Sequence, residues 1–401
     1  MPSLNKAHYI IFTTVLIDML GMTIVLPSLP LYVERFSTSA LMIGMVYSVF
    51  AACAFLAGPI LGSLSDRYGR KPVLVTSIIG TSIGWVIFAI APNIWIIFLS
   101  RVIDGFTAGN ISVAQSYLSD IAKDNKDRAL KLGMIPMAIG IGFITGPAIG
   151  GLLTKISTTL PFWVTAGIAL LNGLAALKFL PESIKKKQIH NHIEFNPFKS
   201  LWYGLTHVKY RILIALLLAT SMAFESYHST FILYLNRAFN FDVSDAGILL
   251  SGIGLMIAFN QLVLMKHFWL HRFKPFTIQL ITSCGLVLLF LGAVFANLTI
   301  FLPILIILGL FEGTLTVING SELAAAAEEH ERGKIIGVSH SLIALSQVIA
   351  PAMAGFLMDF FLPSPWALSA FWMTIVFFIL FRNRNALKNQ HVEAQLEKAA
   401  Q

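Results

Sequence analysis

Long apolar stretches separated by short polar connections make up most of this 401-residue chain. An apolar run of about 20 residues is long enough to cross a bilayer core about 30 Å thick. A bilayer offers no water to unpaired backbone groups, and these runs lack the ten-residue alternation of barrel strands, so each run is predicted to be a helix. The pattern therefore predicts an all-α membrane protein with twelve transmembrane helices, at residues 8–32, 41–65, 73–92, 95–118, 131–154, 162–180, 208–236, 245–265, 276–296, 300–322, 334–360 and 366–382.

The charge distribution explains a basic balance that could otherwise suggest a nucleic-acid partner. The chain is 56% hydrophobic and 12% charged, with a net charge of +8, whereas soluble domains carry roughly 25% charged residues. Only three of its 28 Lys and Arg residues fall on the connections of one side, namely Arg35, Lys155 and Arg237. Basic residues concentrate on the cytoplasmic side of membrane proteins, so both termini are predicted to be cytoplasmic. The basic residues then orient the protein in the membrane and interact with anionic lipid headgroups, and no nucleic-acid partner is expected.

Several other classes of protein are disfavoured by what the sequence contains. The first apolar run holds Asp18 and Pro27 and has no small-residue cleavage site, so it is predicted to be a retained span and not a signal peptide. Cys53 and Cys284 lie far apart within predicted spans, which favours neither a disulfide nor a metal site. The chain has no phosphate-binding Gly-x4-Gly-Lys-Ser/Thr loop and no His-Glu-x2-His motif. We expect no enzymatic activity, no cofactor and no metal.

The connection between the second and third spans, residues 62–74, has a specified geometry. Gly69 can adopt a positive φ at a sharp reversal, and Pro72 suits the first turn of the next helix. Asp66 lies near the C-terminal end of its own helix, where an anion needs compensating cations. An orientation signal alone would not require the glycines. The residues that define this loop are Gly62, Asp66, Arg67, Gly69, Arg70 and Lys71.

This loop resembles the signature of the major facilitator superfamily, Gly-x-Leu-x-Asp-Arg-x-Gly-Arg-Lys, at every defining position. The resemblance implies two pseudo-symmetric six-helix bundles. It also implies a cytoplasmic gating latch formed by Asp66, Arg70 and Asp120, with Asp66 then placed against the start of span eleven near Lys334.

The fifth predicted span carries glycines at spacings of four residues, a pattern that lets another helix approach closely. The full pattern resembles the antiporter motif of the drug-proton antiporters, Gly-x8-Gly-x3-Gly-Pro-x2-Gly-Gly. Its six defining residues here are Gly133, Gly142, Gly146, Pro147, Gly150 and Gly151. A packing stripe without a transport role is the alternative.

The two halves of the chain look like a duplicated unit. The passage that follows Arg128 superposes on the passage that follows Arg332 at an offset of 204 residues, which is about half the chain. Duplicated bundles are expected of secondary transporters, although a chance match over few positions is the alternative. The predicted organisation is an N-terminal bundle at 1–180, a polar cytoplasmic linker at 181–207, a C-terminal bundle at 208–382 and a cytoplasmic tail at 383–401.

Ionisable residues are rare in the predicted spans and are therefore candidates for function. A charge at the centre of a membrane costs about 2.5–3.5 kcal/mol on insertion scales. Family resemblance implies that spans one, four, seven and ten line the central cavity, and each of them holds such a group. We hypothesise that Asp18 and Arg101 form a proton-coupling pair, with Asp104 beside them. A permanent structural ion pair is the alternative, and Asp104 departs from the uncharged residue that the family often has there.

The seventh and tenth predicted spans contain candidates for cargo binding. Glu225 and His228 share one helix face with Tyr227 beside them, while Glu312 and Asn319 follow one another along span ten. An aromatic pocket with one placed carboxylate would suit an amphipathic or cationic ligand. The alternative is an interior histidine with aromatic residues that pack or face lipid.

Taken together, these motifs are similar to those of the twelve-span drug-proton antiporters, which include bacterial tetracycline and multidrug exporters. The resemblance implies proton-coupled export of a small amphipathic molecule by alternating access, from a monomer in the bacterial inner membrane. Gly84 stands where tetracycline exporters carry an acidic residue, so tetracycline itself is disfavoured. The alternative cargo is a siderophore or another endogenous metabolite, moved in either direction. A membrane receptor or lipid-modifying enzyme is disfavoured by the repeat and the lack of catalytic groups.

Overall fold

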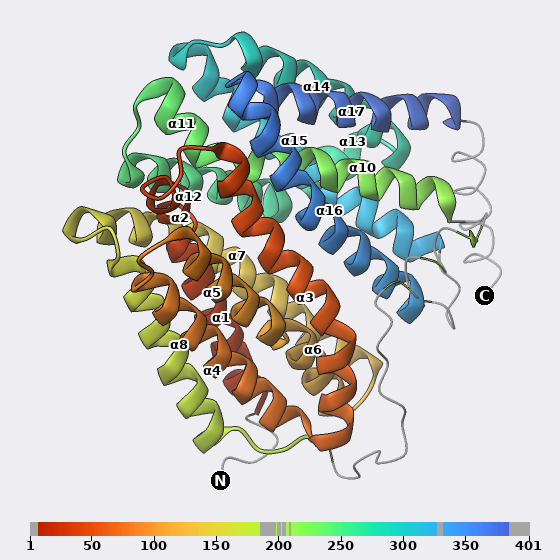
Figure 1. Ribbon diagram of the computed structural model, residues 1–401. Coiled ribbons are helices and arrows are strands. Elements are labelled where there is room, and N and C mark those ends of the chain that lie inside the picture. Colours follow the sequence, from red (N-terminus) through yellow and green to blue (C-terminus); the bar gives the residue numbers. More distant parts are fainter. Residues whose placement is uncertain are drawn as a thin grey trace, which may run out of the picture. The chain divides into compact units, whose positions relative to one another are not determined.

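The computed structural model describes residues 7–184, 210–326 and 332–384, together with residues 198, 202, 206 and 207. Most of the predicted linker and of the predicted tail lies outside these residues, as does the side chain of Lys334. Regular structure in the described residues is entirely helical (Figure 1). The helices are α1 (Ala7–Val25), α2 (Ser28–Val33), α3 (Ala40–Tyr68), α4 (Arg70–Ala89), α5 (Ile94–Thr107), α6 (Asn110–Asp120), α7 (Asn125–Ile156), α8 (Leu160–Phe179), α10 (Arg211–His228), α11 (Phe231–Phe239), α12 (Val243–Phe259), the π-helix η2 (Asn260–Trp269), α13 (Leu270–Arg272), α14 (Pro275–Phe295), α15 (Leu298–Ala326), α16 (Arg332–Phe360) and α17 (Ser364–Arg382).

The predicted fold class is confirmed. Within the described residues, 11 helices or helix combinations are long and apolar enough to cross a membrane, and the pair α10 and α11, bent by 43°, can form a twelfth span. Each lies where an apolar run predicted a span.

Two predicted spans are interrupted where the sequence pattern alone indicated continuous helices. The first span ends as α1 at Val25, and the short helix α2 starts after Pro27, whose ring cannot continue the backbone hydrogen bonding. The fourth span is divided into α5 and α6 by Ala108 and Gly109. The Thr107 hydroxyl donates to the carbonyls of Ile103 and Asp104 at this break, and such side-chain bonds compete with the regular helix ladder.

Contacts divide the chain into two compact units. The first contains residues 1–197 and 235–252, and the second contains residues 198–234 and 253–401. In the first unit, α1 packs against α7 and α8, and α4 packs against α5 and α8. In the second, α10 packs against α16 and α17, and α14 packs against α15 and α17. The predicted domain boundaries follow the order of the chain and remain a prediction.

Segment 235–252 joins the first unit through specific contacts. Arg237 at the end of α11 forms an ion pair of 2.8 Å with Glu34. The Ser251 hydroxyl accepts a hydrogen bond of 3.0 Å from the backbone N–H of Ala148 in α7. The first contact ties the end of α11 to the residue after α2, and the second ties α12 directly to α7.

The glycine stripe of α7 faces α1, and the two helices, both in the first unit, run side by side (Figure 1). A Cβ built on Gly142 would lie 3.0 Å from the Cβ of Met19, and one on Gly150 would overlap the backbone carbonyl of Ile24. The Thr23 hydroxyl donates to the Gly142 carbonyl at 2.9 Å, a direct bond between the two helices. The stripe therefore brings two backbones into contact, as small residues do at membrane helix interfaces.

The other residues of the predicted antiporter motif differ in their surroundings. A Cβ on Gly146 would overlap the Thr23 side chain, whereas one on Gly151 would lie 2.8 Å from the Cα of Ser244. Pro147 is buried in the same helix, and its carbonyl lies where a Cβ on Gly247 would point. A Cβ on Gly133 would meet nothing within 4 Å, so packing does not explain the glycine at that position.

Candidate functional site

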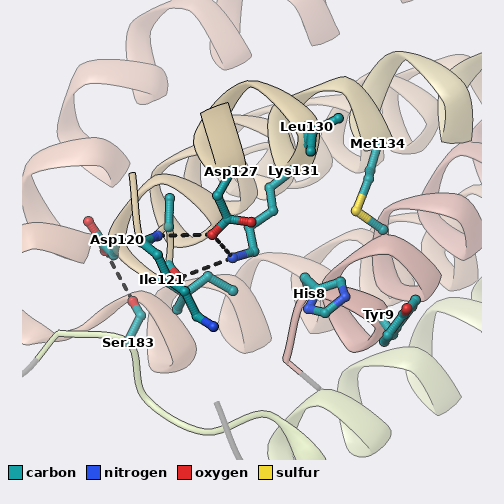
Figure 2. A pocket seen from close by; sticks show the side chains of 11 residues that line it. His8, Tyr9, Asp120, Ile121, Asp127, Leu130, Lys131, Met134 and Ser183 are labelled. Carbon is teal, nitrogen blue, oxygen red and sulfur yellow. Dashed lines mark hydrogen bonds and ion pairs between the residues drawn. The ribbon is translucent and has the colours of Figure 1, made fainter. Parts of the chain in front are cut away.

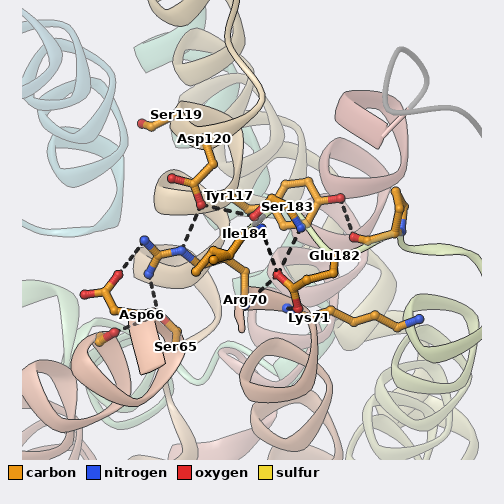
Figure 3. Close-up of polar contacts among 12 residues, drawn as sticks. Ser65, Asp66, Arg70, Lys71, Tyr117, Ser119, Asp120, Glu182, Ser183 and Ile184 are labelled. Carbon is orange, nitrogen blue, oxygen red and sulfur yellow. Dashed lines mark hydrogen bonds and ion pairs between the residues drawn. The ribbon is translucent and has the colours of Figure 1, made fainter. Parts of the chain in front are cut away.

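The predicted gating loop is held together by one guanidinium group (Figure 3). The Arg70 side chain lies 2.6 Å from the Asp66 carboxylate and 3.0 Å from the Asp120 carboxylate, and it donates a 2.6 Å hydrogen bond to the Ser65 hydroxyl. Arg70 thereby joins the ends of α3 and α6 to the first residue of α4. The structure thus brings together the three residues that family resemblance assigned to the latch.

The remaining predicted loop residues make separate contacts of their own. The Arg67 guanidinium lies 5.5 Å from the centre of the Tyr68 ring, and Lys71 contributes its backbone N–H to the loop. A Cβ built on Gly62 would meet nothing within 4 Å, and the Gly62 carbonyl accepts a hydrogen bond from the Ser65 hydroxyl.

Glu182 is a member of the loop cluster that the sequence analysis missed. Its carboxylate accepts hydrogen bonds from the backbone N–H groups of Arg70 at 2.9 Å and Lys71 at 3.2 Å, at the N-terminus of α4 (Figure 3). A carboxylate is favourable there because the end of the helix presents unpaired N–H groups and a partial positive charge. Ser183 also donates to Asp120 at 3.1 Å. The signal that could have indicated this contact is the tripeptide Pro-Glu-Ser directly after the sixth span.

Replacing Gly69 with Ala is expected to destabilise the loop. Gly69 has φ +116°, and a Cβ there would overlap the Glu182 carboxylate. Backbone conformations reserved for glycine cost of order 1–3 kcal/mol when another residue adopts them. We therefore expect the melting temperature in detergent to fall measurably, whereas Gly58→Ala in α3, which has nothing within 4 Å of the added carbon, is the matched control. Equal melting temperatures for the two variants would contradict this role of Gly69.

A surface cavity of about 610 Å³ lies at one end of α1, α6 and α7 (Figure 2). His8, Tyr9 and Leu130 line it together with Asp120 and Lys131. Both of its carboxylates are already paired, because Lys131 lies 2.5 Å from Asp127 and Asp120 is bonded to Arg70. This pairing leaves the cavity without a free carboxylate for a cationic cargo.

In the first unit, the three predicted proton-coupling residues do not form the expected arrangement. Arg101 pairs with Asp104 of the same helix at 3.1 Å, and its guanidinium carbon lies 3.9 Å from the centre of the Trp85 ring and 4.8 Å from that of Phe88. Arg101 is buried, with 3% of the residue's surface exposed. Asp104 is the nearer acid because residues three apart on a helix are neighbours. The expected pair of Asp18 and Arg101 is therefore absent from the interactions of the described residues.

Asp18 has a different partner. The side chain of Asn110 donates a 2.8 Å hydrogen bond to the Asp18 carboxylate, and Asn110 is the first residue of α6 after the break in span four. The N-terminus of this half-helix favours a negative charge.

Gly84, which the sequence analysis aligned with the acid of tetracycline exporters, lies beside Asp104. A Cβ built on Gly84 in α4 would lie 2.9 Å from the Cβ of Asp104, so the acid on α5 fills the space beside this glycine.

In the second unit, three helices bring polar groups around Glu312 and Glu225. The Glu312 residue is 7% exposed, its carboxylate accepts a hydrogen bond from the Tyr227 hydroxyl, and its other oxygen lies 3.2 Å from Nε2 of His228. Glu225 accepts a 3.2 Å hydrogen bond from Gln347 of α16, a residue that the sequence analysis did not single out. The structure therefore groups Glu225, Tyr227 and His228 of α10 with Glu312 of α15. We call these four residues the carboxylate cluster.

Aromatic rings enclose one side of the carboxylate cluster. The Tyr227 ring stacks on Trp366 with centroids 5.3 Å apart and lies 5.4 Å from Phe290. Asn319, the fifth residue predicted to bind cargo, uses its amide within the protein, accepting from Gln279 at 2.9 Å and donating to Thr220 at 3.2 Å. The carboxylate cluster thus combines the buried Glu312 and the half-buried Glu225 with an apolar wall, as ligand sites commonly combine a few polar groups with apolar surface.

Comparison with known proteins identifies the class. Residues 11–318 and 214–399 match the family model of the Major Facilitator Superfamily. The chain therefore belongs to this superfamily of membrane transporters.

Relatives and solved structures agree with this assignment. The chain is 31% identical over 261 residues to the class C tetracycline resistance protein of Escherichia coli, a match that spans 64% of this chain and 66% of that protein. It is 28% identical over 370 residues to multidrug resistance protein 1 of Bacillus subtilis (strain 168), over 90% of this chain and 91% of the relative. A single-residue mutant of the nucleoside transporter NupG matches the fold with a TM-score of 0.78 at 15% identity, covering 94% of this chain and 99% of that one.

Proposed function

We propose that this transporter exports small amphipathic cations in exchange for protons, by alternating access. The relatives are named for resistance to tetracycline and to multiple drugs, which supports export of drug-like cargo. We take the protein to work as a monomer in a bacterial inner membrane, with both termini on the cytoplasmic side as the charge distribution predicts.

The observation that carries this proposal is the burial of Glu312 between a phenol, an imidazole and aromatic rings. A carboxylate removed from water is costly unless it is paired, protonated or occupied by a cation. A cationic cargo and a proton therefore compete for the same negative charge. Binding of one displaces the other, which is the condition for exchange.

The other groups of the carboxylate cluster can take part in the same proton exchange. His228 lies close enough to Glu312 to share a proton with it, and Glu225 supplies a second carboxylate from the same helix. Tyr227, Phe290 and Trp366 pack against one another as a buried apolar wall, which keeps water away from the Glu312 side of the cluster. Protonation and cargo each shift the conformational equilibrium only by their differential affinity for its states.

Purified protein in liposomes that carry an imposed pH gradient tests this function. We expect ethidium to accumulate in the acidic lumen faster than in protein-free liposomes, and the protonophore-treated sample to lose this accumulation. Accumulation that is unchanged after the gradient collapses would exclude proton coupling, whereas a siderophore complex that moves while ethidium and tetraphenylphosphonium do not would exclude the cargo class.

Asp18 offers a separate prediction for the first unit. Asp18→Asn removes the ionisable group next to Asn110, and we expect proton-driven ethidium flux to fall at least about tenfold, equivalent to about 1.4 kcal/mol in the barrier. Thr13→Val on the same helix is the control, because its hydroxyl bonds to the backbone carbonyl of Tyr9. Undiminished proton-driven flux in the Asp18 variant would remove this residue from the coupling mechanism.

A further inference from the structure

The second unit contains an unusual helical segment packed against α15, the helix that carries Glu312. After Phe259 the chain continues as the ten-residue π-helix η2, from Asn260 to Trp269. π-helical turns are rare, usually limited to a single turn, and frequent at functional sites. The first residue of this segment, Asn260, has 0% of its surface exposed.

The Asn260 side chain makes three hydrogen bonds. Its carbonyl oxygen accepts a 3.1 Å bond from the indole N–H of Trp269, so one side-chain contact links the two ends of η2. Its amide nitrogen donates to the Leu310 carbonyl at 2.9 Å and to the Thr314 hydroxyl at 2.8 Å. We call this arrangement the Asn260 clasp. A buried amide is retained at low cost only when its hydrogen bonds are made, so the clasp fixes η2 against α15.

The clasp holds α15 at the height of Glu312. Leu310 and Thr314 lie two residues before and two residues after Glu312 in this helix. Residues two apart on a helix point in widely different directions, so the clasp grips the helix on a face away from the carboxylate. Gly313 permits this approach, because a Cβ there would lie 3.3 Å from the Asn260 amide nitrogen and 3.3 Å from Cγ2 of Ile257.

We propose that Asn260 is a positioning residue for Glu312. The clasp sets the rotation and height of α15 so that the Glu312 carboxylate stays within reach of Tyr227 and His228. The titratable groups that interact with Glu312 all come from α10, namely Tyr227, His228 and Glu225. Among the described residues, η2, α14 and α16 add no titratable group to these interactions. This inference rests on the proposed role of Glu312 in proton exchange.

Asn260→Leu removes the hydrogen bonds while it keeps a side chain of similar size. We expect about a tenfold lower rate of proton-driven ethidium transport, with a KM for ethidium, measured at a pH above the binding midpoint, within about twofold of wild type. We also expect the pH midpoint of tetraphenylphosphonium binding in detergent to move by about one unit, because a tenfold change in an equilibrium corresponds to one pH unit. Trp269→Phe removes only the bond across η2 and is expected to move the midpoint less, in the same direction.

The control is Thr282→Val in α14. Thr282 is equally buried, but its hydroxyl donates only to the carbonyls of Ile278 and Gln279 in its own helix. An unchanged midpoint in folded Asn260→Leu and Trp269→Phe proteins, or an equal shift in the Thr282 variant, would overturn the positioning role. A wild-type protein whose tetraphenylphosphonium binding shows no pH dependence would instead contradict the proposed function of Glu312.

Discussion

Glu312→Gln is expected to reduce proton-driven export by at least about 100-fold, equivalent to about 2.7 kcal/mol in the barrier. Gln has nearly the same size and can still accept a hydrogen bond from the Tyr227 hydroxyl, so the packing of α15 is retained. A glutamine side chain cannot gain or lose a proton and carries no negative charge. Neither the proton nor the cationic cargo can therefore bind at this position. The measurement is the initial rate of ethidium movement in liposomes with a fixed pH gradient.

A matched control separates loss of this carboxylate from loss of any acidic group. Asp242 lies in the connection before α12, where its carboxylate accepts a hydrogen bond from the backbone N–H of Asp245. Asp242→Asn retains that cap, because Asn is also a good residue at a helix N-terminus, and it should transport like wild type. A proton-driven rate within twofold of wild type for folded Glu312→Gln would exclude Glu312 as the exchange site.

Gly150→Ala is the second change for which we expect a large effect. The added Cβ would overlap the backbone carbonyl of Ile24, and a backbone atom cannot move aside as the end of a side chain can. Overpacking costs roughly 1–3 kcal/mol, and more where the surroundings cannot shift. Because α1 packs along α7, we expect a smaller yield of monodisperse protein and a lower melting temperature in detergent.

Gly140→Ala provides the control on the same helix. A Cβ there meets nothing within 4 Å, and Ala is a better helix former than Gly by roughly 1 kcal/mol, so this variant should be at least as stable as wild type. Equal stability of the Gly150 and Gly140 variants would show that α1 and α7 do not depend on this close contact.

Much of the fold could be predicted because the hydrophobic runs reflect a strong physical requirement. A span must be apolar and about 20 residues long, and both properties can be counted along the chain. The interruption after Pro27 has a visible cause in the proline itself, whereas the break at Ala108 depends on the carbonyls to which the Thr107 hydroxyl donates. The bend between α10 and α11 likewise falls within one apolar run.

The candidate sites were predictable where their residues are close in sequence. Asp66 and Arg70 are one helical turn apart, and a spacing of four residues suggests an ion pair directly. The contact of Glu182 with the N–H of Arg70 joins residues 112 positions apart, which requires the folded bundle. For Arg101 the nearer acid, Asp104, was visible in the sequence, but the aromatic rings that surround the guanidinium were not.

In the carboxylate cluster, too, some residues could be recognised from the sequence while their partners could not. Glu225 and His228 were recognised from their shared helix face, yet His228 contacts Glu312 of another helix and Glu225 contacts Gln347. Asn260 had no signal of its own, because a single Asn in an apolar run reveals neither a π-helix nor the three partners of its amide.

The most direct measurement of proton exchange uses a cargo gradient as the only driving force. Liposomes containing the protein and a lumenal pH dye are loaded with tetraphenylphosphonium, clamped at zero membrane potential and diluted into cargo-free buffer at the same pH. We predict that protons enter as the cation leaves, so the lumen acidifies, and that Glu312→Gln liposomes do not acidify. Alkalinisation of the lumen, or cation efflux with no change in lumenal pH, would contradict exchange at this carboxylate.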